Sequence, residues 1–350
     1  MATDADIARA AETLRRGGLV AFPTETVYGL GADADNAAAL ARLYAVKGRP
    51  GEHPVIVHIG APAQLDEWAA EVPVVARLLG DALWPGPLTL VVRRAARVLD
   101  GVTGGGDTVG VRMPDQPVAL ALLRAFGGGI AAPSANRFGH VSPTTAEDAR
   151  AELGDDVDVV LDDGPCTVGV ESTIVDCTGD ELVILRPGGV TREHVEEVSG
   201  RAVGIRRDGL TRAPGTLKSH YAPDATVLVV DRDDLARRAT ALLVAGQRVA
   251  VLGPDPVPAL PSDVIVLDAP ADSDEYARVL YARLREVDRR GVDVLLAVPP
   301  PDAGVGVAVG DRLRRAAGRG QGAAMTAASP TGNAGAGACD GANQGDRGAP

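Results

Sequence analysis

Short apolar runs bounded by glycine, proline or charged residues recur along residues 1–205, and they alternate with segments of helical periodicity. The helical spacing predicts helices at 5–17, 36–46 and 145–153, and a broken helix at 66–83. The apolar runs predict strands at 17–23, 53–59, 88–94, 107–114, 129–136, 157–164, 171–177 and 181–188. The first part of the chain is therefore expected to be a mixed α/β domain that ends near residue 205.

A second pattern begins at residue 226, where strands and helices alternate regularly. It predicts strands at 226–230, 248–253, 263–268 and 292–298, and helices at 232–245, 274–290 and 308–318. This alternation is typical of a small, parallel, Rossmann-like α/β domain, here 226–318. Residues 206–225 have mixed charge and little periodicity, which indicates a linker, and the Gly- and Ala-rich tail 319–350 is predicted to be disordered.

Composition narrows the class of protein. The 350 residues allow two domains, and 45% hydrophobic residues with only 3% aromatic ones predict cores of Val, Leu, Ile and Ala. The net charge of −12 argues against a general nucleic-acid binder. No apolar run is long enough to span a membrane, no signal peptide is recognised, and three cysteines lack metal-like or redox-like spacing. We expect a cytoplasmic protein.

Lysine is almost absent: of 35 basic residues only Lys47 and Lys218 are lysines. A coding bias towards arginine would leave two lysines by chance, whereas a chemical need for a compact ammonium group would retain them at specific places. Lys47 belongs to the stretch KGRP, in which Lys47 and Arg49 follow a predicted helix. This pair suits a polyphosphate, but it equally suits a basic cap on the helix C-terminus.

Polar residues collect where other predicted strands end. Arg112 and Arg186 each leave a strand, and Ser172 begins one. The stretch APSANRFGHVSPT (132–144) adds hydroxyl and amide groups, although such residues also dominate plain turns. Two arginines beside hydroxyl-rich turns indicate an anion site at one edge of a sheet. A Walker-type phosphate loop and a nucleophile elbow are absent from the sequence.

Seven stretches occur in an order that resembles the YrdC/Sua5 family, the threonylcarbamoyl-AMP synthases: FPTETVYGLG, KGRPGEHPVIVHI, WPGPLTLV, TVGVRMPD, APSANRFGHVSPT, VGVESTIVD and ILRPG. The second domain and the linker APGTLKSHYAPDA resemble the longer Sua5 subtype, so that the resemblance covers about residues 5–318. It implies a YrdC-like twisted mixed sheet with flanking helices in domain 1–205.

The resemblance also implies a reaction. L-threonine, bicarbonate or CO2, and ATP would give L-threonylcarbamoyl-AMP and pyrophosphate, with Mg2+ accompanying ATP and no metal ligand from the protein. The product would serve the t6A modification at position 37 of tRNAs that read codons starting with A. A separate transferase complex would complete that step, and direct tRNA contact is left open.

The family's functional residues map onto specific positions of this chain. The resemblance implies a catalytic signature at Lys47, Arg49, Ser134 and Asn136, and a threonine site at Thr26, His58, Arg112, Ser134 and Ser172. It implies ATP contacts at Lys47, Arg49, His53, Thr108, Ala132 (through its backbone), Ser142, Arg186 and Tyr221. Position 53 is commonly asparagine in the family, so His53 is a departure.

Two local roles follow as expectations. Glu25 either orders the turn that carries Thr26 or binds the substrate ammonium. The linker 206–225 is expected to cover the active site as a lid with Tyr221 near ATP, the alternative being plain packing between domains.

Two other functions are weighed against this one. A non-catalytic RNA-binding protein would suit a concave basic sheet, but the acidic charge and few aromatic residues disfavour it. A carbamoyl-adenylate enzyme of hydrogenase maturation would need acylphosphatase and zinc-finger segments, which the sequence lacks. Threonine-dependent release of pyrophosphate from ATP would distinguish the threonylcarbamoyl-AMP synthase from the RNA-binding protein.

Overall fold

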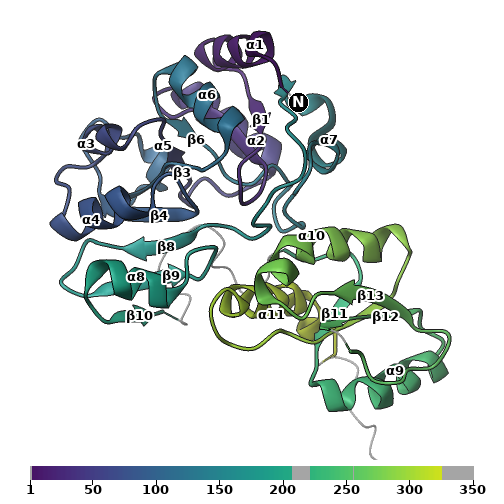
Figure 1. Cartoon of the computed structure of the whole chain (residues 1–350). Coiled ribbons are helices and arrows are strands. Elements are labelled where there is room, and N and C mark those ends of the chain that lie inside the picture. Colours follow the sequence, from purple (N-terminus) through teal and green to yellow (C-terminus); the bar gives the residue numbers. More distant parts are fainter. Residues whose placement is uncertain (1, 207–220, 255, 325–350) are drawn as a thin grey trace, which may run out of the picture.

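The computed structural model describes residues 2–206, 221–254 and 256–324, with backbone only at 319–324. These residues form two α/β domains, each built around its own sheet (Figure 1). The first sheet is mixed and has ten strands, and the second is parallel and has four. The predicted fold class is therefore confirmed. Among the described residues, no helix is both long and apolar enough to cross a membrane.

The first domain contains the helices α1 (Asp4–Arg15), α2 (Ala37–Lys47), α3 (Leu65–Trp68), α4 (Val74–Leu83), α5 (Asp100–Thr103), α6 (Pro117–Phe126), α7 (Ala146–Leu153) and α8 (Arg192–Ser199). Its strands are β1 (Val20–Phe22), β2 (Gly29–Asp33), β3 (Ile56–His58), β4 (Leu88–Arg93), β5 (Thr108–Arg112), β6 (Ile130–Ala131), β7 (Val159–Val160), β8 (Thr173–Asp176), β9 (Leu182–Arg186) and β10 (Val203–Ile205). They lie in the order β10-β9-β8-β4-β5-β3-β6-β2-β1-β7.

The two faces of this sheet are covered unequally. Val57 and its neighbours on one face pack against α2, α3, α4, α5, α7 and α8 in the main core. On the other face α1 and α6 cover only the end formed by β1, β2 and β6, around Phe22 and Ile130. Ile56 and His58 point to this second face, as the alternation in β3 predicts. The part of it formed by β3, β5, β4, β8 and β9 holds the candidate site.

Helix α2 shows how the sequence delivers a functional residue. The side chain of Asn36 accepts hydrogen bonds from the backbone N–H groups of Ala38 and Ala39 at 3.0 and 3.1 Å, which makes Asn36 the N-cap of the helix. The helix is capped at its C-terminus by Gly48, whose φ of 62° is a left-handed conformation that glycine adopts without strain. Lys47 is consequently the last residue of the helix, and its side chain is buried.

The second domain is a three-layer unit. Its strands β11 (Thr226–Val229), β12 (Val249–Pro254), β13 (Ile265–Ala269) and β14 (Val294–Ala297) lie in the order β11-β14-β12-β13. Helix α9 (Leu235–Val244) covers one face, and α10 (Ser273–Arg289) and α11 (Gly306–Ala324) cover the other. Helices α10 and α11 also face the first domain (Figure 1), because Val27, Val141 and Val170 join their apolar cluster.

Several elements differ from the sequence prediction. Strand β2 was not predicted, nor were α5, α6, α8 and β10. Helix α11 continues to Ala324, past the predicted end at 318, although the added residues include Gly320 and Gly322, which have low helix propensity. Disorder of 325–350 stays a prediction, since that segment lies outside the described residues. The same holds for the proposed lid, of which only 206 and 221–225 are described.

Candidate active site

Nine of the fourteen residues predicted for the site line one cavity on this second face of the first sheet. They come from loops and strand ends that are far apart in the sequence: Thr26, Arg49, His58, Arg112, Ala132, Ser134, Ser172, Arg186 and Tyr221. The other lining residues are Thr24, Val27, Gly29, Ile56, Pro133 and Glu171. The cavity therefore combines cationic, hydroxyl and small apolar groups.

A hydroxyl turn presents Thr26 to the cavity. Thr24 Oγ1 donates to the carbonyl of Val27 at 2.6 Å and accepts from the N–H groups of Thr26 and Val27 at 3.2 Å. The two threonine hydroxyls lie 2.8 Å apart. Because the Thr24 proton is used by Val27, the Thr26 hydroxyl donates to Thr24 and keeps its lone pairs for a ligand.

His58 is neutral in this environment. It is paired with Arg112 in the parallel register of β3 and β5, and its ring lies edge-on to Phe22, with 6.0 Å between the centroids. Burial, reinforced by the charge of Arg112, lowers the pKa of His58 to about 3. Its Nδ1 atom has no hydrogen-bond partner in the described part of the chain. A neutral ring with an unused nitrogen can serve a polar substrate group.

Arg112 faces the same end of the cavity and forms a buried ion pair with Glu25, with 2.8 Å between Nη2 and Oε2. The alignment of this contact falls outside hydrogen-bond geometry, so that it is Coulombic. The carboxylate of Glu25 therefore balances the charge of Arg112, and the two roles considered for Glu25 from the sequence stay predictions.

Arg49 and Arg186 add two more cationic groups. Arg186 donates to the carbonyl of Ser172 at 2.8 Å and to its hydroxyl at 3.0 Å, and that hydroxyl lies 2.8 Å from the hydroxyl of Thr89. Arg49 donates to the carbonyl of Pro54 at 2.7 Å. Burial lowers the pKa of Arg49, and the charge of Arg186 acts in the same direction. Two buried guanidinium groups that line one cavity favour a multiply charged anion.

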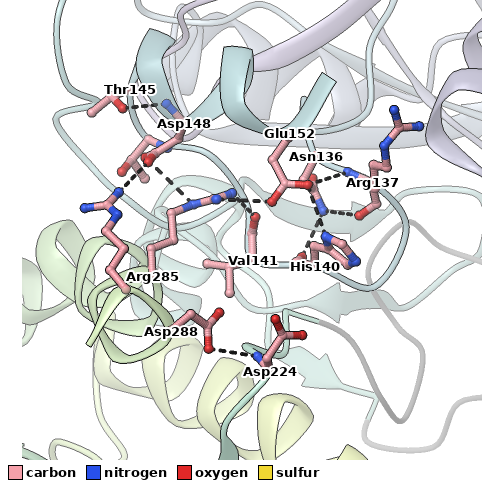
Figure 2. Close-up of polar contacts among 12 residues, drawn as sticks. Asn136, Arg137, His140, Val141, Thr145, Asp148, Glu152, Asp224, Arg285 and Asp288 are labelled. Atoms are coloured by element: carbon pink, nitrogen blue, oxygen red, sulfur yellow. Dashed lines mark hydrogen bonds and ion pairs between the residues drawn. The ribbon is translucent and has the colours of Figure 1, made fainter. Parts of the chain in front are cut away.

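Lys47 and Asn136 lie beneath the wall of the cavity rather than in it. Lys47 Nζ donates to the carbonyls of Ser134 and Asn136 at 2.5 and 2.6 Å, and burial holds its pKa well below the usual range. The amide of Asn136 donates to the carbonyls of Arg137 and His140 at 2.8 and 2.9 Å (Figure 2). Both residues therefore fix the loop that carries Ser134.

Three further predicted residues lie outside the lining. The hydroxyl of Ser142 donates to Glu171 at 2.7 Å. Thr108 begins β5, on the same face of the strand as Arg112, and is half-buried. The ring of His53 lies edge-on to Phe138, with 5.9 Å between centroids. ATP contacts by these three residues stay predictions.

Glu171 is a charged residue of the cavity lining that sequence reasoning missed. It lies in the stretch VGVESTIVD, directly before Ser172, and its carboxylate accepts from Ser142, from Tyr281 and from Arg312. Burial would raise its pKa, but Arg312 and Arg186 hold the pKa of Glu171 at about 2. Its position in a quoted motif was an available signal, whereas no local pattern marks Tyr281 and Arg312.

Comparison with known protein families finds two models that match the chain. A family model for Sua5, YciO and YrdC, described as telomere recombination, matches residues 12–188. A second model, the C-terminal domain of threonylcarbamoyl-AMP synthase, matches residues 190–318. The chain belongs to the Sua5/YciO/YrdC family. The boundary between the two matches falls just after β9, whereas α8 and β10 still pack with the first sheet.

Members of the Sua5/YciO/YrdC family resemble this chain along most of its length. Threonylcarbamoyl-AMP synthase from Pyrococcus abyssi is 42% identical over 320 residues, which cover 88% of this chain and 93% of that protein. The protein of the same name from Bacillus subtilis is 41% identical, with 90% and 94% covered. The crystal structure of P. abyssi Sua5 complexed with L-threonine superimposes with a TM-score of 0.86 at 40% identity, covering 91% of this chain and 96% of that one.

Proposed function

We propose that this chain joins L-threonine, bicarbonate or CO2, and ATP to give L-threonylcarbamoyl-AMP and pyrophosphate. The observation that carries the proposal is the single cavity in which Thr26, His58 and Arg112 meet Arg49 and Arg186. The first three suit a small polar amino acid, and the last two suit a polyphosphate. The names and the high coverage of the two relatives support the same activity.

The chemistry requires placement more than covalent catalysis. The amine of threonine adds to CO2 and loses a proton, which gives a carbamate. A carbamate oxygen then attacks the α-phosphate of ATP, the bond between the α-phosphorus and the bridging oxygen breaks, and pyrophosphate leaves. No protein nucleophile takes part, so orientation and charge neutralisation suffice.

The proposed threonine-binding part of the cavity consists of neutral and charged groups described above. Arg112 would bind the carboxylate of the substrate, and Thr26 with its free lone pairs would accept a hydrogen bond from the substrate hydroxyl. Neutral His58, Ser134 and Ser172 would complete the polar contacts. A site that hydrogen-bonds the hydroxyl would reject valine by ~10⁴-fold and would reject serine much less well.

The nucleotide end would use the guanidinium groups of Arg49 and Arg186 against the phosphates. Additional contacts are proposed for Lys47, His53, Thr108, the backbone of Ala132, Ser142 and Tyr221. Among the described residues there is no cluster of three His, Cys, Asp or Glu side chains that could hold a metal ion. We propose that Mg2+ accompanies ATP, where it would supply charge neutralisation of the triphosphate.

The wider setting is proposed on chemical grounds. A mixed carbamic–phosphoric anhydride is a reactive carbamoyl donor, so a separate transferase complex would pass the threonylcarbamoyl group to adenosine 37 of tRNA. The net charge of −12 favours release of the product over tight tRNA binding by this chain. A cytoplasmic location would fit this role.

The deciding experiment incubates the protein with ATP, labelled bicarbonate and each amino acid in turn. We expect a labelled adenylate and stoichiometric pyrophosphate with L-threonine, and much less of both with valine. Absence of any threonine-dependent adenylate would overturn the proposal. Binding of RNA without adenylate formation would instead favour the RNA-binding alternative.

A further inference from the structure

One carboxylate connects the cavity with the second domain. Glu171 lines the cavity, and its oxygens accept hydrogen bonds from residues of α10 and α11. Tyr281 of α10 donates its hydroxyl to Glu171, with 2.8 Å to Oε2 and 3.0 Å to Oε1. Arg312 of α11 donates from Nε to Oε2 at 2.7 Å. All three side chains are buried, so that these contacts are shielded from solvent.

Tyr281 and Arg312 also contact a second residue of the cavity wall. Tyr221 lines the cavity, and its ring stacks on Tyr281 with 5.7 Å between centroids. The guanidinium of Arg312 lies 5.1 Å from the centroid of the Tyr221 ring, and Arg312 Nη2 donates to the carbonyl of Pro187 at 3.0 Å. Tyr281 and Arg312 therefore touch two residues of the cavity wall without lining it themselves.

A second group of contacts keeps α10 in place against the first domain (Figure 2). Arg285 donates to the carbonyl of Val141 and to Glu152 Oε1, the latter at 3.1 Å. Arg289 donates to Asp148 at 3.0 Å. Since Val141 directly precedes Ser142, helix α10 supports the loop that also bonds to Glu171.

We propose that Tyr281 and Arg312 are positioning residues for the nucleotide end of the active site, acting through Glu171. The inference rests on the proposed function and adds to it a task for the second domain. Arg312 neutralises Glu171, and Tyr281 with Ser142 fixes the orientation of its carboxylate.

The electrostatic reason is specific. A carboxylate in the wall beside Arg49 and Arg186 would repel a triphosphate and would compete for both guanidinium groups. With Arg312 on Oε2, the negative charge of Glu171 is balanced. Removing Arg312 alone should therefore harm ATP binding more than removing Arg312 and the Glu171 charge together.

The experiment uses the full chain and compares Arg312→Met, Glu171→Gln and the double variant. We measure KM and kcat for ATP and for threonine, and the Kd for ATP by calorimetry. Arg312→Met should raise the KM and Kd for ATP by about tenfold or more, with the KM for threonine nearly unchanged. The double variant should recover a large part of that loss.

A matched pair on α10 separates positioning from simple stability. Tyr281→Phe removes the hydroxyl that donates to Glu171, whereas Tyr276→Phe removes an equally buried hydroxyl that donates to Val298 inside the second domain at 3.1 Å. We expect Tyr281→Phe to raise the KM for ATP by about fivefold and Tyr276→Phe to change it by less than about twofold. These two variants still test the inference if Arg312→Met does not fold.

Three results would overturn the inference: a double variant no better than Arg312→Met, equal effects of Tyr281→Phe and Tyr276→Phe, or lower melting temperatures with an unchanged Kd for ATP. Failure of the proposed function is recognised separately, because the wild-type protein would then form no adenylate. In that case the calorimetric Kd for ATP still decides whether Tyr281 and Arg312 act on a nucleotide site.

Discussion

Glu25 Oε2 and Arg112 Nη2 lie 2.8 Å apart in the interior, and each side chain is 5% exposed. Neither Glu25 oxygen accepts a well-aligned hydrogen bond from the described residues. Arg112 is therefore the group that compensates the charge of the Glu25 carboxylate. A buried ion pair adds little net stability, but removal of one partner leaves an uncompensated buried charge. The pair therefore prepares a substrate-facing guanidinium at the cavity.

The variant Glu25→Gln tests this ion pair through two quantities, the free energy of unfolding and the stabilisation by L-threonine. The isosteric change leaves Arg112 unpaired, and we expect the free energy of unfolding to fall by ~3–5 kcal/mol. L-Threonine should then stabilise the variant more than the wild type, because its carboxylate supplies the missing counter-charge. Urea denaturation with and without L-threonine measures both. The exposed Glu67→Gln should change the unfolding free energy by less than ~0.5 kcal/mol, and weaker stabilisation of Glu25→Gln by threonine would show that Glu25 binds the ammonium instead.

Thr26→Val tests the hydroxyl turn. The change preserves volume and removes the group whose lone pairs face the cavity, so the KM for threonine should rise by about tenfold or more while the KM for ATP changes little. The preference for threonine over valine should narrow at the same time. In the variant there is no Thr26 hydroxyl that bound valine would leave without a partner. Competition of the two amino acids for adenylate formation measures the ratio. An unchanged ratio would place the hydroxyl contact elsewhere.

The sequence predicted much of the architecture because local signals were strong. Asn36 before a helical run and Gly48 after it delimit α2, and the regular alternation after residue 226 predicts the parallel second domain. Strand β2 was missed because Gly29 and Gly31 are typical of turns. Tertiary packing makes this segment a strand, because β2 pairs with β1 on one side and β6 on the other. The packing is close, since a Cβ on Gly31 would lie 2.8 Å from Ile130 Cγ2.

The candidate site was predictable where motifs end strands and was not predictable where two domains meet. Arg112 and Arg186 follow apolar runs, so their place at a sheet edge could be read from the sequence. Tyr281 lies on an amphipathic helix and Arg312 on an Arg-rich one, where the pattern indicates only a packed or a solvated face. Their contact with Glu171 depends on the docking of the domains, which periodicity does not encode.

Lys47→Ala should abolish pyrophosphate release. The ammonium of Lys47 is held by the carbonyls of Ser134 and Asn136, so its removal both loosens the Ser134 loop and takes away a cation near the site. We expect turnover to fall by at least about 10²-fold while circular dichroism shows a folded protein. Arg42→Ala on the same helix removes a half-exposed ion pair with Asp158 and a hydrogen bond to the carbonyl of Asp156, and should leave turnover unchanged. Normal turnover of Lys47→Ala would exclude Lys47 from the mechanism.

His58 makes the stability of the protein depend on pH. Its folded-state pKa of about 3 lies below the unfolded value of about 6.5, so that the unfolded state binds the additional proton between these values. Stability from this residue is complete above the unfolded pKa and is lost as the pH falls below it. The loss continues until the folded pKa is reached.

The variant His58→Gln should remove the pH-dependent part of the stability that His58 causes, without introducing a charge. Linkage from a single group with these pKa values predicts that the wild type loses about 1.4 kcal/mol more unfolding free energy than the variant between pH 7.5 and 5.5. The remaining histidines contribute equally to both proteins, and Glu171 stays ionised over this range because its pKa is about 2. Urea denaturation at the two pH values measures the difference. Parallel losses in the two proteins would mean that His58 titrates normally, and therefore that water reaches the ring at the threonine end of the cavity.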